Sequence, residues 1–390
     1  MNRRVFNFQT IPILFLASRL FLIIALPLEG LRGFGDFVHF YHLAGMGWPF
    51  INYWVEFPPV FPFLSTILYQ LAGGREHVYD YLLVLILSLA QAGSLALFIR
   101  LARKQLGMEA GTRRAWIYFA FLAGLAYGWW YFDPLAVFAM LLGLFWLGEG
   151  KDSRAGIALA LGTLIKWFPV LALVVVWRWR SFRQALWVTF ITLGITAVVY
   201  AGLYIASPGI TVASLRSQAS KGSWETVWAL VDGNFKTGNF GPEVERLDPA
   251  KAQVPQGNPP RLSSWLTLIP FAGLGLWLFM RSDRTRERSS ISLLGLTLCI
   301  FFMWSPGWSP QWALYLLPLI LLGLPSREGT LAALIFILTN LLEWPVLLTR
   351  GYNWGLWFTI PARSFILVLL ALEFWKMLKK TLHIGITEAV

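Results

Sequence analysis

The chain has 390 residues, of which 57% are hydrophobic and only 13% are charged. Ordinary globular domains carry roughly 25% charged residues, so this composition excludes a water-soluble protein and is typical of a chain that faces lipid. The formal net charge is +12, but the basic residues lie in short clusters between long apolar runs. Such clusters are typical of cytoplasmic loops in membrane proteins, and we therefore expect membrane lipids, and no nucleic acid, as partners.

The apolar runs, taken in chain order, predict a polytopic helical membrane protein. They are continuous and rich in leucine, whereas membrane strands would alternate apolar and polar residues. The first run follows Met-Asn-Arg-Arg and has no small-residue cleavage site after it, so we predict an uncleaved span there. The fold class is therefore predicted as all-α. The runs cover residues 8–28, 57–72, 80–101, 115–131, 133–149, 155–177, 184–204, 263–280, 291–304, 311–324, 330–349 and 361–378.

The basic clusters predict the topology, because short cytoplasmic loops collect Lys and Arg. All clusters fall on one side if the Pro-rich run 57–72 lies on the membrane surface and if 155–177 enters and returns around Lys166. With these two adjustments we expect about twelve membrane helices, two of them short and hairpin-like, in a single domain over 1–390. The clusters are Arg3–Arg4, 100–114, 151–154, 178–183, 281–288, Arg327 and 376–380.

The first extracytoplasmic segment, 29–79, is expected to hold juxtamembrane helices. Its titratable residues Asp36, His39, His42 and Glu56 lie among aromatic ones. An interfacial aromatic belt explains the tryptophans and tyrosines of this segment, but it does not explain Asp36, which is framed by a glycine and two phenylalanines. An aspartate can accept the proton of an attacking hydroxyl group, so Asp36 is a candidate general base. The two histidines fit a structural and a functional role equally well.

Four further ionisable residues lie at or near the ends of predicted spans. Asp133, followed by Pro134, fits either a helix N-cap or a contact to substrate. Lys166 lies at membrane depth, where it suits a partner such as Asp133 or Glu343, or a lipid phosphate. Arg19, in the outer half of the first span, belongs to the same class. Glu343 lies near the outer end of its own run.

The second extracytoplasmic segment, 205–262, is a long loop that mixes cations, carboxylates and indoles. Aromatic faces with polar groups at their edges suit a sugar, and the cations suit a phosphate. The same composition also fits a solvated loop that a tryptophan anchors to the membrane. The candidates for substrate binding here are Arg216, Lys221, Trp224, Glu225 and, in a Trp-rich outer turn, Gln311.

Taken in chain order, these motifs resemble the GT-C superfamily, polytopic glycosyltransferases that use polyprenyl-phosphate sugar donors. The likeness is greatest to the branch that transfers mannose, and it covers most of the chain. The matching pieces are Gly35-Asp36, Glu56-Phe57-Pro58-Pro59, Phe132-Asp133-Pro134, the stretch 163–169, Gly222-Ser223-Trp224 and the stretch 309–312.

The resemblance implies a hexosyltransferase of cell-envelope glycan or glycolipid synthesis that works on the extracytoplasmic face. Asp36 would act as the general base of an inverting transfer of a hexose, mannose by the likeness, from the lipid phosphate to a lipid or glycan acceptor. Cationic side chains would stabilise the leaving phosphate, and the candidates are Lys166, Arg216 and Lys221. Many GT-C enzymes carry paired acidic residues in the first loop, and Asp36 has no adjacent carboxylate. We therefore expect no obligatory metal and no cofactor besides the lipid-linked donor.

Two other functions compete with this interpretation. A transporter or flippase for a lipid-linked sugar would need polar groups on both sides of the membrane midplane. The sequence collects them on one side, which favours the enzyme. A non-catalytic scaffold would leave Arg19, Lys166 and Glu343 as costly charges without a role.

Overall fold

The computed structural model describes residues 10–238, 241–254, 256–282 and 287–387, and the side chains of 219–220, 287–288 and 380–387 are not described. The chain is 80% helical, and no sheet occurs in the described part, which confirms the predicted all-α class. The basic cluster Arg3–Arg4 and residues 283–286 of another cluster lie outside the described residues.

The helices follow the predicted apolar runs closely. In chain order they are α1 (Thr10–Ala25), α2 (Leu28–Arg32), α3 (Phe37–Gly45), α4 (Val60–Leu71), α5 (Glu76–Leu106), α6 (Met108–Gly124), α7 (Tyr127–Trp130), α8 (Asp133–Gly148), α9 (Asp152–Ile165), η1 (Phe168–Ala172), α10 (Leu173–Trp179), α11 (Phe182–Ala206), α12 (Pro208–Ser220), α13 (Val227–Asp232), η2 (Glu243–Leu247), η3 (Pro249–Gln253), α14 (Ser264–Arg281), α15 (Glu287–Trp304), η4 (Pro310–Trp312), α16 (Ala313–Gly323), α17 (Ser326–Leu341), η5 (Leu342–Leu347), η6 (Leu348–Arg350), η7 (Asn353–Gly355) and α18 (Leu356–Thr387).

Apolar helices of spanning length support an integral membrane protein. Five helical segments of the described chain are long and apolar enough to cross a bilayer, and they are Glu76–Leu106, Phe182–Ala206, Ser264–Arg281, Ser326–Arg350 and Asn353–Lys379. Shorter apolar helices such as α1, α8 and α16 accompany them. The count of about twelve membrane helices stays a prediction. Helix α4 has 12 residues, about 18 Å of helix, so it is too short to span alone, as its prolines predict.

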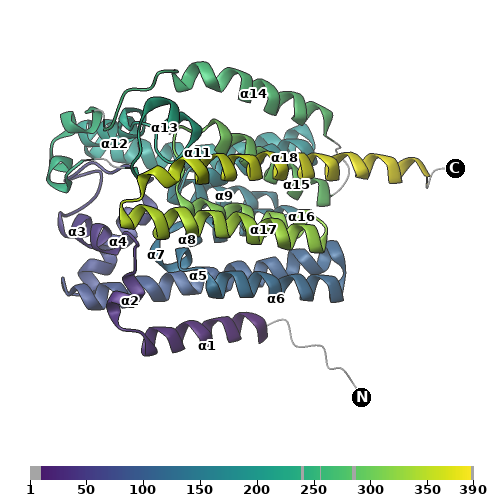
Figure 1. The fold of residues 1–390 in the computed structure, drawn as a ribbon, viewed down its shortest axis with the longest axis horizontal. Helices are drawn as coiled ribbons and strands as arrows, with labels where there is room; N and C mark the ends of the chain where they lie inside the picture. The colour runs from purple at the N-terminus through teal and green to yellow at the C-terminus, as the bar shows by residue number, and fades with distance from the viewer. Residues whose placement is uncertain (1–9, 239–240, 255, 283–286, 388–390) are drawn as a thin grey trace. The chain divides into compact units, whose positions relative to one another are not determined.

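The first of two compact units comprises Met1–Asn52, Phe57–Val170 and Thr189–Ala201. Its centre is the 31-residue helix α5, which packs against α1, α6 and α8. Figure 1 shows α1, α5 and α6 running side by side. Helix α9 packs along α8, and α3 packs on α4. This unit carries Asp36, Asp133 and Lys166.

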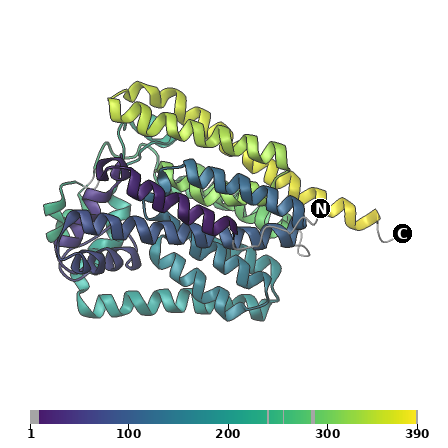
Figure 2. The ribbon, with the colours of Figure 1, turned by 90° about the horizontal axis from the view of Figure 1, so that it is seen from below.

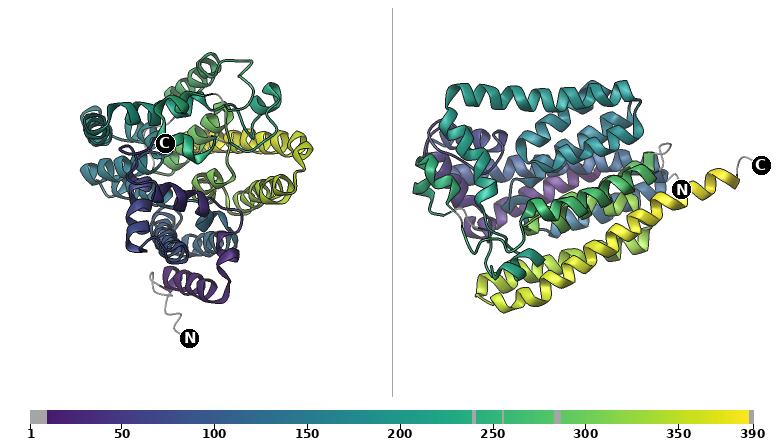
Figure 3. Two further views of the ribbon diagram at one scale, coloured as in Figure 1. Left: turned by 90° about the vertical axis from the view of Figure 1, so that its left-hand side faces the viewer. Right: turned by 90° about the horizontal axis from the view of Figure 1, so that it is seen from above.

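The second unit comprises Tyr53–Glu56, Leu171–Val188 and Gly202–Val390. Helix α18 packs against α15 and α17, and the yellow-green pair α17 and α18 lies side by side in both Figure 2 and Figure 3. The long outer loop is more helical than its composition predicts, because it contains α12, and α12 packs on η3.

Two helix ends matter for the candidate site. Helix α9 ends at Ile165, and Lys166 has an extended backbone (φ −152°, ψ 143°) before η1 begins. The chain therefore breaks at Lys166, as the charge pattern predicts. Helix α8 begins at Asp133 itself, its N-cap is Phe132, and no side chain caps the helix. The N-cap interpretation of Asp133 is therefore wrong, because the carboxylate is engaged elsewhere.

Candidate functional site

The candidate base Asp36 packs against the main chain of Trp130, the last residue of α7, which we name the α7 shelf. The Asp36 N–H donates to the Trp130 carbonyl at 3.2 Å. A Cβ atom on Gly35 would lie 2.6 Å from that carbonyl oxygen, so only glycine permits this approach. Asp36 precedes α3, but its side chain makes no capping bond to the helix. The backbone is therefore fixed by α7, while the partly exposed carboxylate is not used as a helix cap.

Asp133 and Lys166 form a second part of the same unit. The Lys166 ammonium lies 3.7 Å from an Asp133 carboxylate oxygen, and Asp133 is fully buried. The ammonium also lies 4.5 Å from the ring centre of Phe132 and 5.3 Å from that of Phe57. Ring faces attract cations, so the lysine is held by one carboxylate and two aromatic rings. Of its two expected partners, Lys166 has Asp133 and not Glu343.

An aromatic cluster joins these two parts. The Phe132 ring stacks on Phe61 of α4 with ring centres 4.0 Å apart, and its edge contacts Phe40 of α3 at 5.7 Å. Helix α3 begins directly after Asp36, and Phe132 directly precedes Asp133. The base candidate and the Lys166 cation are thus mounted on one packed cluster within the first unit. On α3, His39 is partly exposed and His42 is exposed, with ring contacts to Phe40 and Tyr41 respectively.

Arg19 of α1 is buried away from solvent and contacts uncharged groups. Its guanidinium donates to the carbonyl of Leu122 and to the side-chain amide oxygen of Gln91, and it lies 4.3 Å from the ring centre of Trp129. Arg19 was expected to pair with a carboxylate or with a phosphate, and no carboxylate of the described residues lies within ion-pair distance of it.

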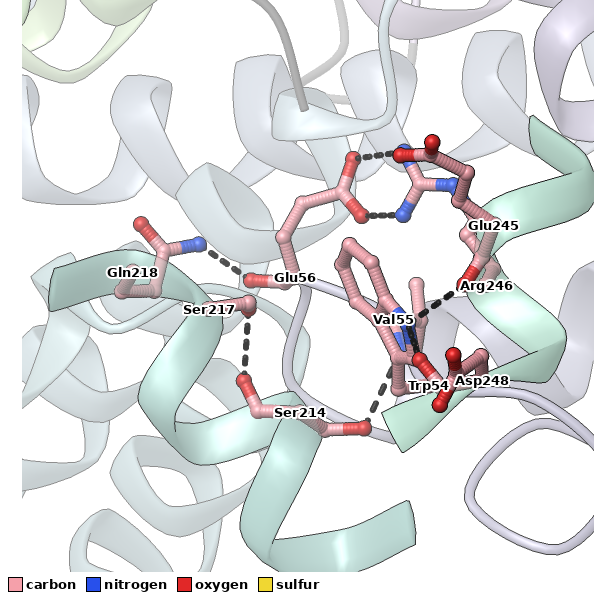
Figure 4. A network of polar contacts seen from close by, with 9 residues as sticks. All are labelled: Trp54, Val55, Glu56, Ser214, Ser217, Gln218, Glu245, Arg246 and Asp248. Atoms are coloured by element: carbon pink, nitrogen blue, oxygen red, sulfur yellow. Dashed lines mark hydrogen bonds and ion pairs between the residues drawn. The ribbon is translucent and has the colours of Figure 1, made fainter. Parts of the chain in front are cut away.

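In the second unit Glu56 is neutralised by an arginine of the long outer loop, Arg246. Both guanidinium ends of Arg246 donate to the two Glu56 carboxylate oxygens, and both side chains are buried (Figure 4). Arg246 also lies 4.9 Å from the ring centre of Trp54, whose indole N–H donates to the carbonyls of Glu245 and Asp248 at 3.1 Å. These contacts hold segment 53–56 against the outer loop.

Helix α12 completes this attachment. The Ser214 hydroxyl accepts from the Val55 N–H at 3.0 Å, and the Gln218 amide donates to the Glu56 carbonyl. Glu56 was predicted as a substrate-binding residue. Its carboxylate meets a guanidinium of this chain with both oxygens, so its visible role is to dock segment 53–56 on α12 and η2.

Arg246→Met is expected to lower the free energy of unfolding by about 3–5 kcal/mol, because the Glu56 carboxylate stays buried without its cation. Replacing both Glu56 and Arg246 by methionine is expected to recover most of that loss, since no buried charge then remains. Chemical unfolding in detergent, followed by tryptophan fluorescence, measures both. Equal destabilisation by the single and the double substitution would show that the ion pair is not what holds the segment.

A second buried charge cluster contains Glu343 and Glu225. Arg363 of α18 donates to the Glu343 carboxylate and to the main-chain carbonyl of Glu225, and the Thr359 hydroxyl donates to Glu343. Glu225 has a positive φ of 52° and is 2% exposed. Burial, reinforced by the negative charge of Glu343, raises the pKa of Glu225 well above its usual range. The guanidinium of Arg363 and the ammonium of Lys221 oppose this rise, and burial outweighs them.

The remaining loop candidates lie around an indole cluster. The Lys221 ammonium lies 3.7 Å from the ring centre of Trp224, and the Trp224 indole N–H donates to the Ser309 hydroxyl at 3.4 Å. The rings of Trp224 and Trp312 meet edge to face at 6.3 Å. Gln311 is buried beside Trp312, whereas Arg216 is exposed on α12. Lys221 and Trp224 thus belong to one cluster with Trp312, and Arg216 is exposed to solvent.

Sequence reasoning missed four residues that organise these sites. Arg363 lies in a predicted apolar run, and a charge at that depth was a signal that the run carries a buried pair. Gln91, in run 80–101, carried a weaker signal of the same kind. Arg246 and Trp130 gave none, because their roles depend on contacts distant in sequence. The described parts of the chain contain no group of three or more His, Cys, Asp or Glu side chains placed to hold a metal ion.

Comparison with known proteins identifies a fold likeness only. No family model matches the chain, and no curated protein matches its sequence. The crystal structure of ArnT from Cupriavidus metallidurans in the apo state is similar over 94% of this chain and 77% of that chain, with a TM-score of 0.50 and 14% identity. The same protein bound to undecaprenyl phosphate gives a TM-score of 0.48 and 15% identity over the same shares. At this identity the likeness shows the fold alone.

Proposed function

We propose that the chain is a GT-C-type membrane glycosyltransferase. It transfers a hexose, mannose by the motif resemblance, from a polyprenyl-phosphate donor to a lipid or glycan acceptor on the extracytoplasmic face, with inversion. The observation that supports this most is the mounting of Asp36 and the Asp133–Lys166 pair on one segment, 130–133. The fold likeness to ArnT, a GT-C family enzyme, agrees with it.

The proposed reaction uses one base and one cation. The Asp36 carboxylate accepts the proton of the acceptor hydroxyl as its oxygen attacks the anomeric carbon of the donor sugar. The bond between that carbon and the phosphate oxygen breaks, and its electron pair leaves with the polyprenyl phosphate. Lys166 stabilises the negative charge that develops there. Its packing against Phe57 and Phe132 limits the water around the charge and so strengthens its effect.

The outer loop of the second unit also carries groups that suit a phosphate. Lys221, which covers the buried ring of Trp224, and the exposed Arg216 offer cations for a phosphate. The mannose assignment rests on the motif resemblance, and the acceptor is assigned only to the class of lipid or glycan hydroxyl.

A panel of polyprenyl-phosphate sugars, incubated with the purified protein in liposomes that contain host glycolipids, tests this function. We expect mass spectrometry to detect one new glycosylated product and free polyprenyl phosphate for one donor, with mannose favoured over other hexoses. Movement of intact donor across the bilayer without a new glycosidic bond would instead identify a flippase for lipid-linked sugars and overturn the proposal.

A further inference from the structure

Helix α7 contains the α7 shelf, against which Asp36 packs, but α7 is too short to be stable without contacts to other helices. It has four residues, and isolated helices of that length are unstable because one turn does not repay the cost of nucleation. The indole of Trp130 covers Gly33, where a Cβ atom would lie 2.4 Å from the ring, and the Tyr131 hydroxyl donates to the Phe34 carbonyl at 3.5 Å. The position of the loop before Asp36 therefore depends on the position of α7.

Two polar side chains from α1 and α5 fix α7 from the other side. The Gln91 amide N–H group donates to the Gly128 carbonyl at 2.6 Å, and its oxygen accepts from Arg19 at 3.3 Å. Arg19 in turn covers the ring of Trp129 and donates to the carbonyl of Leu122, just before α7. We name Arg19 and Gln91 together the α7 support.

The α7 support is tightly fitted. A Cβ atom on Gly128 would lie 2.3 Å from the Gln91 amide oxygen, so the amide reaches the main chain only because residue 128 is glycine. Arg19 and Gln91 are 1% and 2% exposed. Buried polar groups among apolar helices are costly unless they are hydrogen-bonded, and an arginine within a membrane helix is a marker of function. Neither residue contacts Asp36 or Lys166 directly.

We propose that Arg19 and Gln91 are positioning residues, which hold α7 and through it set the place of the Asp36 carboxylate relative to the Asp133–Lys166 pair. This inference rests on the proposed function and adds to it a role for a buried charge that binds no substrate. A misplacement of about 1 Å, even from a change far from the chemistry, lowers a rate by roughly 10²-fold. The expected signature is therefore a loss of kcat with an unchanged KM.

Gln91→Leu removes the hydrogen bonds that the amide makes to Gly128 and Arg19, at nearly constant volume. We expect kcat to fall by about 10²-fold with little change in the KM for donor. The assay uses the polyprenyl-phosphate hexose that the donor panel identifies. Arg19→Lys, a milder change that keeps the charge, is expected to lower kcat by less. It provides the measurement if Gln91→Leu does not fold.

Thr112→Val is the matched control. The Thr112 hydroxyl accepts from Arg103 at 3.0 Å and joins α5 to α6 at the end far from α7. It removes a helix-to-helix hydrogen bond of the same unit and is expected to leave kcat unchanged. Equal losses of kcat in Thr112→Val and Gln91→Leu would show that the α7 support has only a structural role. A change in KM alone for Gln91→Leu and Arg19→Lys would overturn the inference as well.

Combining the substitutions separates this inference from the proposed function. In an Asp36→Asn background Gln91→Leu is expected to lower the residual rate no further, because the base that it positions is already lost. A further loss of about 10²-fold in that background would overturn the positioning role. An Asp36→Asn variant with wild-type rates would instead overturn the assignment of the base, whatever Gln91→Leu does.

Discussion

Asp36→Asn is expected to lower the rate of glycosyl transfer by about 10²–10⁴-fold, the usual contribution of a general base. The amide has nearly the shape of the carboxylate but cannot take the proton of the acceptor hydroxyl. The main chain is held by the Trp130 carbonyl and by the close contact at Gly35, so the substitution leaves the fold intact. Initial rates with the panel donor, together with the melting temperature of each variant, measure this effect.

Glu29→Gln is the control for Asp36→Asn. Glu29 is an exposed carboxylate on α2, a few residues before Asp36. The Glu29→Gln substitution therefore removes one negative charge from the same extracytoplasmic segment as Asp36→Asn does. Its rate is expected to match the wild type. If Glu29→Gln slows transfer as much as Asp36→Asn, the effect comes from the negative charge of the loop and not from a base at Asp36.

Arg363→Met is expected to lower the free energy of unfolding by about 3–5 kcal/mol, because the buried Glu343 carboxylate loses the guanidinium that it meets. Arg363 contacts the Glu343 carboxylate and the carbonyl of Glu225, and both glutamates are buried. The loss comes from leaving a buried carboxylate without the cation that it meets in the fold. Unfolding in detergent across a pH series, followed by tryptophan fluorescence, measures it.

Glu225→Gln is expected to raise the free energy of unfolding, whereas Arg363→Met lowers it. A carboxyl group whose pKa rises on folding contributes its full stability below the unfolded-state pKa of about 4.3, and this contribution is lost as pH rises through the folded-state value. The neighbouring charges are Glu343, Arg363 and Lys221. Glutamine keeps the shape of the protonated acid, so it removes this loss and stabilises the protein at neutral and alkaline pH. A variant less stable than wild type at alkaline pH would show that Glu225 is ionised in the fold.

Composition and charge predict much of the fold because a membrane restricts a chain severely. Helices are required where the backbone meets lipid, and basic loops gather on one side. These two constraints predicted that the chain breaks at Lys166 and that α4 is too short to span, and the structure has both features. The break follows from the cost of a lysine at membrane depth.

The partners of the buried charges could not be predicted, because they depend on contacts between distant segments. Glu56 meets Arg246, which is 190 residues away in the sequence. Arg19 was expected to meet a carboxylate or a phosphate, yet it contacts Gln91 and the ring of Trp129. The sequence contains many carbonyls and amides that could each pair with a given buried charge, and only the packing of the folded chain selects one of them. The motif resemblance pointed to Asp36, but not to the α7 shelf beneath it.

A stoichiometric transfer assay with doubly labelled donor tests whether the protein transfers sugar from a polyprenyl phosphate with Asp36 as the base. Polyprenyl-phosphate mannose, labelled in the sugar and in the phosphate, is incubated with host glycolipids and either the wild-type protein or the Asp36→Asn variant. We expect the wild type to release one free polyprenyl phosphate for each sugar found in product, and the variant to release both about 10²–10⁴-fold more slowly. Sugar and phosphate labels that stay together on one lipid, or equal release by both proteins, would contradict this expectation.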